Sequence, residues 1–447
     1  MERTPLENWI VYKSGITVRS RKALEEYQLG RIRETVKYAK NNSRFYAEQL
    51  KSVSENELQS LEDLQAIPFT YSYQIRQNSS DFLCVPQKYI ARVVTLNSSG
   101  TTGEEKRIYF TEEDLNHTIE FFKYGMSCLT NKSDRVLVLL PGKAYGTIGD
   151  LLKKALALSE VECFVHGVMI DPEDTAKSIE DNDITCIVGI PAQVLYLSRL
   201  KTELFKSRIK KVLLSTDYVP ETLIHELTQL GCSVFNHYGM TEMGYGGGVE
   251  CQALNGYHMR EADLYFEIVD PDTGKAVPDG QYGEVVFTTL TRKAMPLIRY
   301  RTGDLACFSP TSCACTTFLP TMKRVLGRID NRVCIRDNQF IYLRDLDEII
   351  LGYKEIIDYK AYMTEPDRLN VEIVLKSGQQ SPDTDSGVYS SIRQSLCDAI
   401  QKDLYCRLGY IVNPNVTAIE QNKSDKITNS MVKRKIFDLR GSDNGKQ

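Results

Sequence analysis

The feature that most constrains the fold of this chain is a regular alternation of short apolar runs and amphipathic stretches over residues 134–239. A short apolar run bounded by turn signals predicts a buried strand, and apolar residues at helical spacing predict a helix. Strands that alternate with helices in short units form a largely parallel, doubly wound sheet, and ligands bind at the carboxyl ends of its strands. The expected strands are 135–142, 161–167, 185–191, 210–217 and 231–239, and the expected helices are 150–158, 192–200 and 221–231.

Different patterns flank this region on both sides. Residues 18–65 carry apolar side chains at helical spacing and predict helices. The tighter alternation of residues 264–308, with the turn signals PDTG and PDGQYG, predicts an antiparallel β element. Because 447 residues are too many for one hydrophobic core, more than one domain is expected. We predict an α/β protein with a large N-terminal domain, residues 1–328, of mixed, largely parallel sheets plus a β element. A small C-terminal α+β domain, residues 329–447, follows it.

Bulk composition argues against several classes of function. A net charge of −4 gives no positive field that would attract nucleic acid. The longest apolar runs, such as 136–140, are too short to span a bilayer, and the opening MERTPLENW lacks the layout of a secretory signal. Twelve cysteines in a chain of this length indicate buried thiols, a subset of which can hold metal, and no disulfide scaffold. We expect a cytoplasmic protein without nucleic-acid or membrane partners; the oligomeric state, a homodimer included, stays open.

A run of six small residues marks a candidate phosphate-binding loop between two strand-like runs, 91–96 and 107–110. The loop consists of Ser98, Ser99, Gly100, Thr101, Thr102 and Gly103. Backbone N–H groups in a tight Gly-rich turn form a concavity that can wrap a polyphosphate. Lys106, just beyond the loop, could reach the same phosphates. The loop alone fits a flexible surface turn equally well, and Lys106 alone fits a solvated surface lysine. The helix-opening GxxxxGK[ST] loop is absent.

Three further motifs follow in order: NHYGMTE at 236–242, RYRTGD at 299–304 and GRID at 327–330. In this order and spacing the set resembles the adenylate-forming superfamily of acyl-CoA synthetases and adenylation domains, nearest to its phenylacetate–CoA ligase branch. FTTLTRKAMPLIRYRTGD at 287–304 and the pattern of residues 31–70 favour that branch. The resemblance covers nearly the whole chain. It implies an enzyme that uses ATP to adenylate a small carboxylic acid, aromatic in this branch, releases pyrophosphate and then transfers the acyl group.

Adenylation brings two anions together, so its site needs positive charge, a metal ion and oriented donors around the phosphates. By resemblance, the loop 98–103 and Lys106 hold the leaving phosphates. Thr241 offers its hydroxyl to the α-phosphate, and Glu242 gives Mg²⁺ the hard oxygen ligand it prefers. Taken alone, Thr241 and Glu242 also fit an ordinary helix N-cap.

The same resemblance assigns the contacts to the nucleoside. The ring of Tyr238 stacks on adenine, Gly239 lets the backbone approach the base, and Asp304, in a turn after a strand, accepts the ribose hydroxyls. A turn-capping aspartate would look the same in the sequence. The residues assigned to ATP outside the loop and Lys106 are Ser215, Thr216, Asp217, Asn236, His237, Tyr238, Gly239, Asp304 and Arg328. Asp330 is the implied hinge about which the small domain reorients between adenylation and acyl transfer.

The acid is expected near Tyr145 and Gly146. This segment resembles the aromatic, Gly-rich turn that holds the aryl acid in phenylacetate ligases, and Tyr145 is the expected pocket wall. Gly246, just past Glu242, leaves room on the other side of the pocket or permits a mobile loop. No carboxylate is evident there to pair with an ammonium group, which disfavours an amino acid as the substrate.

Four residues form a candidate zinc site: Cys251, His258, Cys313 and Cys315. Two thiolates on one tight turn and a distant Cys/His pair match a closed, tetrahedral structural zinc site. The phenylacetate–CoA ligase branch shows a similar arrangement. Four unrelated buried residues are the alternative. Such a site would tie the antiparallel element to the nucleotide loop and take no part in catalysis.

The carboxyl-terminal region departs from the family at a residue that matters for adenylation. The family ends on a Gly-Lys turn whose lysine bridges the acyl carboxylate and the α-phosphate. An alignment anchored on Asp438 puts Val432 at that place, with Lys433 next to it and Lys426 further upstream. Lys433 is the candidate replacement, and without a register shift the lysine is lost. Residues 335–339 also lack the glycine of a turn that approaches the active site during thioester formation.

The sequence is therefore compatible with three functions. The leading hypothesis is an acyl-adenylate-forming ligase with ATP, Mg²⁺ and structural Zn²⁺, whose acceptor is CoA, a carrier-protein thiol or an amine. The second is a catalytically impaired nucleotide-binding relative that acts as a binding or regulatory subunit, which Val432 permits. The third is an ATPase or kinase; the absence of a Walker lysine and of an HRD-like catalytic loop counts against it.

Overall fold

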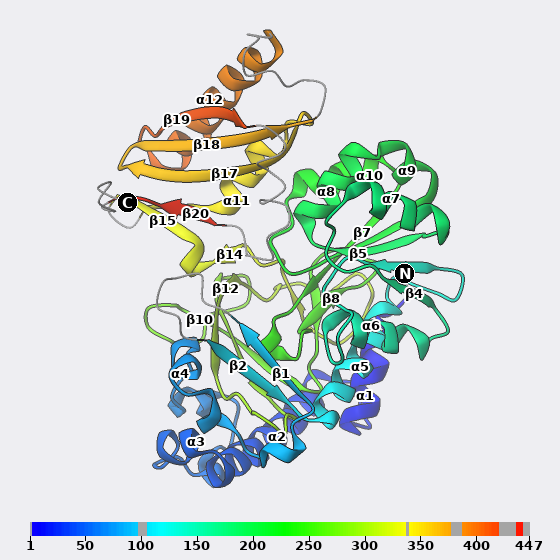
Figure 1. Cartoon of the computed structure of the whole chain (residues 1–447). Helices are drawn as coiled ribbons and strands as arrows, with labels where there is room; N and C mark the ends of the chain where they lie inside the picture. The colour runs from blue at the N-terminus through cyan, green and yellow to red at the C-terminus, as the bar shows by residue number, and fades with distance from the viewer. Residues whose placement is uncertain (1, 97–104, 337–338, 377–386, 420–434, 441–447) are drawn as a thin grey trace.

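The computed structural model describes residues 2–96, 105–336, 339–376, 387–419 and 435–440, with a mixed eight-stranded sheet at its centre (Figure 1). Strands β4, β3, β5, β6 and β7 lie in this spatial order and are parallel, while β8, β9 and β13 continue the sheet antiparallel. Their bounds are β3 Arg135–Val138, β4 Glu162–Val165, β5 Cys186–Gly189, β6 Lys211–Leu214, β7 Ser233–Tyr238, β8 Gly248–Glu250, β9 Tyr257–Met259 and β13 Thr321–Met322. The predicted, largely parallel sheet is confirmed.

Side chains along the parallel strands alternate between two hydrophobic cores, as the two-residue period of a strand requires. Val136 and Val138 belong to the core that contains α5 and α6, whereas Leu137 and Leu139 belong to the core that contains α8 and α10. The helices of this region are α5 Glu112–Met126, α6 Ile148–Ala157, α7 Pro172–Asp181, α8 Pro191–Leu200, α9 Thr202–Arg208 and α10 Glu221–Gln229. Three of them, α5, α7 and α9, were not predicted from the sequence.

The amino-terminal region is helical, but the predicted stretch 18–65 is divided. Its helices are α1 Pro5–Ser14, α2 Arg21–Asn42, α3 Arg44–Gln49 and, further on, α4 Ser72–Gln77. Ser20 accepts a hydrogen bond from the N–H of Ala23, and Ser43 accepts one from the N–H of Tyr46, so each serine caps a new helix. Beyond α3 only short 3₁₀ turns occur up to residue 66, and the prediction of a helix there was wrong.

The predicted antiparallel element is a four-stranded sheet in the order β10-β11-β12-β14. Its strands are β10 Leu264–Val269, β11 Gly283–Thr289, β12 Tyr300–Ala306 and β14 Gly327–Arg328; a separate hairpin pairs β1 Arg92–Leu96 with β2 Lys106–Phe110. Asp304 lies within β12 and not in a turn, which corrects the expectation from the sequence. The TGD signal was misleading because Gly303, at a φ of 77°, makes an irregularity inside the strand.

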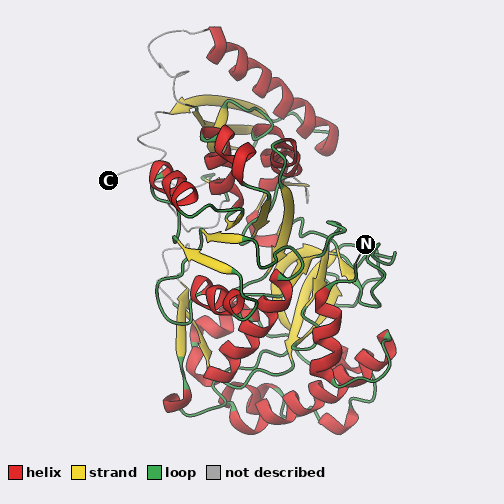
Figure 2. Ribbon diagram, turned by 90° about the vertical axis from the view of Figure 1, so that its right-hand side faces the viewer, coloured by secondary structure: helices red, strands yellow, loops and turns green. Residues whose placement is uncertain are grey.

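The carboxyl-terminal unit has a four-stranded sheet in the order β19-β18-β17-β20, a β15-β16 hairpin and two helices. Their bounds are β15 Arg332–Arg336, β16 Gln339–Tyr342, α11 Leu343–Ile350, β17 Ile356–Glu365, β18 Arg368–Leu375, α12 Gly387–Leu408, β19 Asn413–Ile419 and β20 Ile436–Asp438. In Figure 2 the long helix α12 lies at the opposite end of the molecule from the amino-terminal helices. No helix among the described residues is long and apolar enough to cross a membrane.

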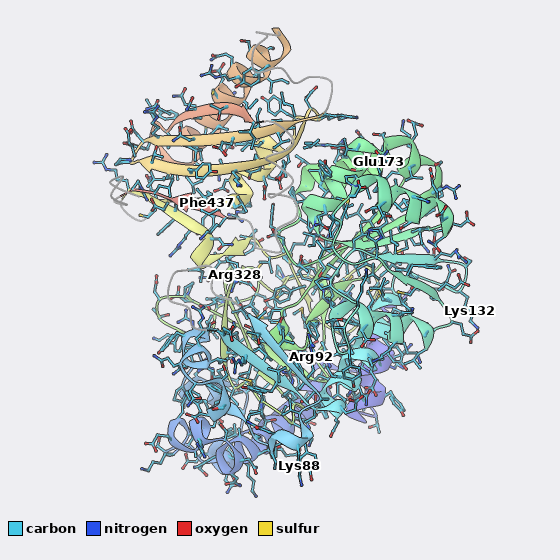
Figure 3. All side chains as sticks on the ribbon, in the orientation of Figure 1. Lys88, Arg92, Lys132, Glu173, Arg328 and Phe437 are labelled. Carbon is cyan, nitrogen blue, oxygen red and sulfur yellow. The ribbon has the colours of Figure 1, made fainter. Side chains whose placement is uncertain are left out.

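Polar contacts join the carboxyl-terminal unit to the central sheet region. Arg199 on α8 donates to the carbonyl of Leu351 at 2.6 Å and to that of Tyr353 at 3.1 Å. Glu348 on α11 accepts hydrogen bonds from the Tyr218 hydroxyl at 2.8 Å and from the N–H of Glu221 at 2.9 Å. In Figure 3, Arg328 lies where the large region gives way to this unit. The junction is therefore built from specific contacts and is not a bare linker.

Candidate active site

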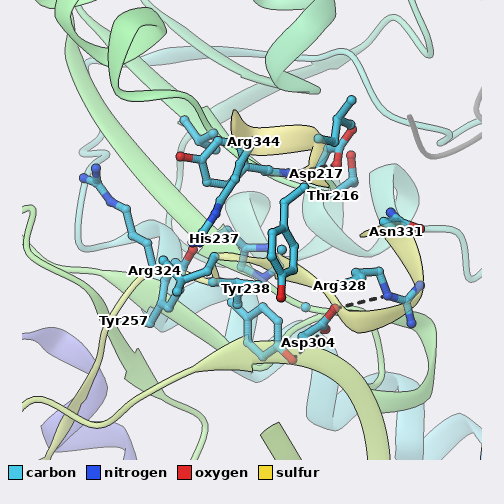
Figure 4. Close-up of a pocket in the computed structure, with 18 residues that line it drawn as sticks. Thr216, Asp217, His237, Tyr238, Tyr257, Asp304, Arg324, Arg328, Asn331 and Arg344 are labelled. Atoms are coloured by element: carbon cyan, nitrogen blue, oxygen red, sulfur yellow. Dashed lines mark hydrogen bonds and ion pairs between the residues drawn. The ribbon is translucent and has the colours of Figure 1, made fainter. Parts of the chain in front are cut away.

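A cavity opens at the carboxyl ends of β6 and β7, where the topology of a parallel sheet predicts a ligand site (Figure 4). β12 and β14 form another side, and Tyr342, Leu343 and Arg344 of the carboxyl-terminal unit complete it. Of the residues assigned to ATP from the sequence, those that line this cavity are Thr216, Asp217, His237, Tyr238, Gly239, Asp304 and Arg328. This cavity, called the nucleotide cavity after the ligand that the sequence predicts for it, thus combines three motifs that lie far apart in the chain.

Tyr238, Asp304 and Arg328 form a linked polar group in the nucleotide cavity. Asp304 and Arg328 are register partners in β12 and β14, and Arg328 Nε lies 3.2 Å from Asp304 Oδ1. The Tyr238 hydroxyl donates to Asp304 Oδ2 at 3.0 Å. Burial, reinforced by the charge of Asp304, raises the pKa of Tyr238 well above its usual value, so the hydroxyl stays protonated. The Asp304 carboxylate still has lone pairs that can accept hydrogen bonds from two neighbouring hydroxyl groups of a ligand.

Asn236 stands behind the cavity and does not line it. Its backbone N–H and its Nδ2 both donate to Glu250 Oε2, at 2.9 and 2.8 Å. Arg324 Nε lies 2.8 Å from the other carboxylate oxygen of Glu250 and itself reaches the cavity wall. Asn236 therefore fixes the end of β7 through a buried carboxylate that the sequence analysis did not single out.

Glu242 is buried, 2% exposed, in the 3₁₀ turn Thr241–Met243 that follows β7. Lys106 Nζ forms an ion pair with Glu242 Oε1 and lies 3.0 Å from Ser72 Oγ. The Tyr300 hydroxyl donates to the same Glu242 oxygen at 3.1 Å. A carboxylate is the oxygen ligand that Mg²⁺ takes together with substrate phosphates, so the chemistry of Glu242 fits this ion, although Glu242 is not among the residues that line the cavity. Lys106 is close enough to act on the same ligand.

A second, apolar cavity lies between α5, α6 and the central sheet. Ten of its lining residues are glycine or apolar, and Ser215 and His237 are the other two; the full set is Phe121, Phe122, Gly125, Met126, Leu140, Ile148, Leu152, Val188, Leu213, Ser215, His237 and Val249. His237 is a lining residue of both cavities, so the two meet at this residue. Ser215 Oγ lies 2.8 Å from His237 Nδ1. Burial lowers the pKa of His237 to about 4, so the ring is neutral at physiological pH.

The residues predicted to hold the acid lie in different places. Tyr145 is 47% exposed, its hydroxyl contacts Glu112, and it is not among the residues lining the apolar cavity. The carbonyl of Gly146 accepts a hydrogen bond from Tyr245 at 3.0 Å. A Cβ at Gly246 would come within 2.4 Å of Phe121, so this glycine lets the backbone touch the wall of the apolar cavity.

Cys251, His258, Cys313 and Cys315 converge, and their ligand atoms all lie within 4.8 Å of one another. Cys251 follows β8, His258 lies in β9, and the other two are in the loop between β12 and β13. The sulfurs of Cys251 and Cys313 are 3.7 Å apart. Tetrahedral zinc with Zn–S bonds of about 2.3 Å needs thiolate sulfurs about 3.8 Å apart, so this donor set fits the ion.

The four residues also share a hydrogen-bonded environment. Cys315 Sγ lies 3.4 Å from His258 Nε2. Burial by itself raises the pKa of the Cys315 thiol, but hydrogen bonds from His258 and from the N–H of Thr317 outweigh it and leave that pKa below its ordinary value. Burial raises the pKa of Cys251 well above the ordinary thiol value. A bound cation would hold both sulfurs as thiolates.

Several predicted residues are not placed by these contacts. The loop 98–103 and Lys433 lie outside the described residues, as do Val432 and Lys426. Asp330 is in the 3₁₀ turn Ile329–Asn331, at the junction between the two regions of the chain.

Sequence reasoning missed the long-range parts of the site. Tyr257 and Arg324 line the nucleotide cavity from β9 and from the loop before β14, and Arg344 comes from the carboxyl-terminal unit. Phe121 and Phe122 lie on α5, a helix that was not predicted. The apolar repeat of residues 115–126 was the one local signal that could have found the last two.

The chain was compared with known families. A family model described as AMP-binding enzyme matches residues 54–290, more than half of the chain. Phenylacetate-coenzyme A ligase of Thermus thermophilus is 30% identical over 364 residues, which cover 78% of this chain and 80% of that protein. The protein of the same name from Aromatoleum evansii is 27% identical over 431 residues, covering 93% of this chain and 95% of the relative.

A solved structure supports the fold over almost the whole length. The crystal structure of 2-hydroxyisobutyryl-CoA ligase in the postadenylation state superposes with a TM-score of 0.79 at 19% identity. It covers 94% of this chain and 90% of that one. The predicted α/β fold and the resemblance read from the motifs are thereby confirmed. The chain belongs to the AMP-binding enzyme family, the adenylate-forming superfamily, in its phenylacetate–CoA ligase-like branch.

Proposed function

We propose that this protein is an ATP-dependent, AMP-forming acid–CoA ligase whose substrate is a small, predominantly apolar carboxylic acid, with aromatic acids as the first candidates. The observation that carries the proposal is the junction of the two cavities. A polar cavity with Asp304 and Tyr238 meets a cavity with apolar walls at His237. A nucleotide on one side and the body of an acid on the other would bring the carboxylate to the α-phosphate.

Each polar group has a defined task in the first half-reaction. Asp304 accepts the ribose hydroxyls, and Tyr238 and Gly239 provide the face on which adenine lies. Glu242 would hold Mg²⁺, which when bound neutralises phosphate charge and polarises the phosphoryl oxygens. Lys106 pairs with Glu242 in this structure and can turn to the phosphates when they enter, because its long side chain is already at the site. Loop 98–103 and Thr241 would provide further donors.

The carboxylate oxygen of the acid attacks the α-phosphorus, and the bond to the β-phosphate oxygen breaks, releasing pyrophosphate. Cationic groups promote this step because charge shifts onto the leaving phosphates. Lys433 is the candidate for the cation that bridges carboxylate and α-phosphate. The acyl carbon of the adenylate is then attacked by a thiol, and AMP leaves.

CoA is the proposed acceptor, because the relatives that cover most of the chain are named as coenzyme A ligases. A carrier-protein thiol and an amine are the other candidates, because residues 335–339 depart from the glycine-bearing turn of the family. We further propose residues 1–328 and 329–447 as the two domains, with Asp330 as the hinge. The contacts of Arg199 and Glu348 would hold the small domain against the large one during adenylation.

The Cys/His cluster is proposed as a structural Zn²⁺ site. Its donor set leaves no ligand position for substrate, and it joins β8, β9 and the loop before β13 beside the end of β7. The ion would therefore keep Glu250 and Asn236 in place, two residues whose hydrogen bonds form the back of the nucleotide cavity.

Acid-dependent exchange of labelled pyrophosphate into ATP tests this proposal, with a panel of aryl, heteroaryl, alkyl and amino acids. Exchange with one chemical group of acids is the expected result. A parallel assay with CoA should convert ATP to AMP and form an acyl-CoA. ATP binding without exchange for any acid would reject the ligase and favour the second candidate, a nucleotide-binding subunit without turnover. The specific observation behind that candidate is Val432 at the position of the family's lysine.

A further inference from the structure

The apolar cavity contains one polar pair, two residues that the sequence assigned to ATP but to which the proposed reaction gives no step; Ser215 lines this cavity and not the nucleotide cavity. Ser215 and His237 stand side by side among ten glycine or apolar residues, with no charged side chain in the wall. The absence of charge among the described lining residues favours an acid whose body is neutral. Burying polar atoms in an apolar wall costs free energy unless each atom forms a hydrogen bond. The presence of Ser215 and His237 in this wall therefore needs a physical explanation.

His237 has one hydrogen-bonding atom left over. Its Nδ1 is 2.8 Å from Ser215 Oγ, whereas its Nε2 is covered by protein and has no hydrogen-bond partner among the described residues. The ring contacts Phe121 and Phe122, with centroid distances of 6.3 and 6.2 Å, and both phenylalanines line the same cavity. A buried donor or acceptor without a partner costs about 1–3 kcal/mol.

The hydroxyl of Ser215 indicates which nitrogen carries the proton. Among the described residues, the structure gives Ser215 Oγ one hydrogen-bond partner, His237 Nδ1. The hydroxyl proton has an acceptor only if Nδ1 is unprotonated. A neutral imidazole then carries its proton on Nε2, so a residue that lines an apolar cavity holds a hydrogen-bond donor without a partner among the described residues.

We propose that the acid bound here carries a hydrogen-bond acceptor on its apolar body, and that the Nε2–H of His237 selects it. Ring nitrogens and ether, carbonyl or hydroxyl oxygens are acceptors of the required kind. This inference rests on the proposed function, and it narrows the substrate class from apolar acids to acids with one such acceptor.

The position of His237 also indicates where the acceptor lies on the acid. His237 is a lining residue of the nucleotide cavity, where Figure 4 labels it, and of the apolar cavity. The carboxylate must meet the α-phosphate at that junction, so the acceptor lies within a few bonds of the carboxylate, as in ortho-substituted aryl acids. Nε2 is covered in this structure, so a neighbouring side chain shifts as the acid enters, a change that commonly accompanies binding.

Pyrophosphate exchange with matched acids tests the proposal. Each pair has the same size and differs in the acceptor: 2-pyridylacetate against phenylacetate, and 2-methoxybenzoate against 2-ethylbenzoate, with 2-aminobenzoate as a donor-rich comparison. We expect the acceptor-bearing acid of at least one pair to exceed its isostere in kcat/KM by about tenfold or more, the range for a hydrogen bond in a buried site.

Three variants test whether His237 makes the selection. His237→Phe should abolish the preference, and His237→Gln, which keeps an N–H donor, should keep part of it. Ser215→Ala frees the His237 ring to adopt either tautomer, so it should reduce the difference in kcat/KM between acceptor-bearing and donor-rich acids. If Ser215 had only a structural role, the substitution would lower kcat/KM for both kinds of acid equally.

The outcomes separate this inference from the proposed function. Exchange with no acid at all rejects the ligase. Exchange in which wild-type protein uses each isostere as well as its acceptor-bearing partner leaves the ligase intact and overturns the inference. A preference that survives unchanged in His237→Phe also overturns it, because selection would then come from another group.

Discussion

Two histidines lie on one row of the central sheet and have opposite surroundings. His237 in β7 is the register partner of Val249 in β8, which is in turn the partner of His258 in β9. His237 faces aromatic rings and an apolar cavity, and one ring nitrogen has no partner among the described residues. His258 is fully buried among three cysteines, with Nε2 3.4 Å from the Cys315 sulfur.

The difference shows how one sheet supports both chemistry and stability. At β7 the side chains converge on space that a ligand can enter, whereas the ring nitrogen of His258 that has no partner among the described residues, Nδ1, lies on a residue whose other nitrogen already faces the cysteines. At β8 and β9 the side chains converge on one another, at the spacing of a closed tetrahedral site. Substitutions in the first region should therefore change turnover at little cost in stability. Substitutions in the second should change stability with little direct effect on turnover.

Glu242→Gln is expected to lower turnover more than any other substitution. If it does not, the contrast between the β7 region and the Cys/His cluster is wrong. The variant loses the charge that would hold Mg²⁺, whose effect on phosphoryl transfer is worth several kcal/mol, so pyrophosphate exchange should fall by about 100-fold or more. Glu267→Gln makes the same change at a buried carboxylate that pairs with Arg299 at 2.9 Å and has no proposed role in binding ATP. It should lower the free energy of unfolding and keep exchange per folded molecule. Normal exchange in Glu242→Gln would reject the Mg²⁺ assignment.

Loss of the metal is expected to act on stability. Metal analysis of purified protein should find about one zinc per chain. Cys315→Ala, or treatment with a strong chelator, should remove about 2–3 kcal/mol of unfolding free energy and lower Tm by roughly 5 °C or more. Cys186→Ala, at a buried cysteine of β5 outside the cluster, should retain its zinc and its response to chelator. If the purified protein contained no zinc and was equally stable, the Cys/His cluster would not have the stabilising role that distinguishes it from the β7 region.

Asp304→Asn should produce a smaller, ligand-specific effect. A hydrogen bond to a charged group contributes about 1.5–3 kcal/mol, so the KM for ATP should rise by roughly 10–100-fold while Tm changes little. Tyr238→Phe keeps the ring against adenine and loses only the hydroxyl that bonds Asp304 at 3.0 Å, so its KM should rise less. Equal increases in KM for ATP and for a 2′,3′-dideoxy analogue in Asp304→Asn would contradict the ribose assignment.

Local patterns in the sequence were enough to predict the parallel strands and the β element, and the family resemblance predicted the common site at which Tyr238, Asp304 and Arg328 line one cavity. The same local reasoning placed Asp304 in a turn, because a TGD string does not reveal that Gly303 lies inside β12. The family resemblance pointed to Tyr145 for the acid, a residue that does not line the apolar cavity, and no local pattern was used to find Phe121 on α5. Which side chains enclose a cavity depends on packing between helices and sheet, and that information is not contained in any short segment.

The smallest expected effect is a pH dependence of stability, and it sharpens the contrast between the histidines. An unfolded histidine has a pKa near 6.5, whereas burial lowers that of His237 to about 4. Between these values the unfolded chain binds the additional proton, so this contribution to stability is fully present above about pH 6.5 and is lost as the pH falls toward 4. The free energy of unfolding should therefore fall less steeply from pH 7 to pH 5 in His237→Gln than in the wild type. Because other groups titrate in both proteins, only the difference between the two curves reports on His237. Parallel curves would show that His237 binds a proton as readily in the folded state as in the unfolded state.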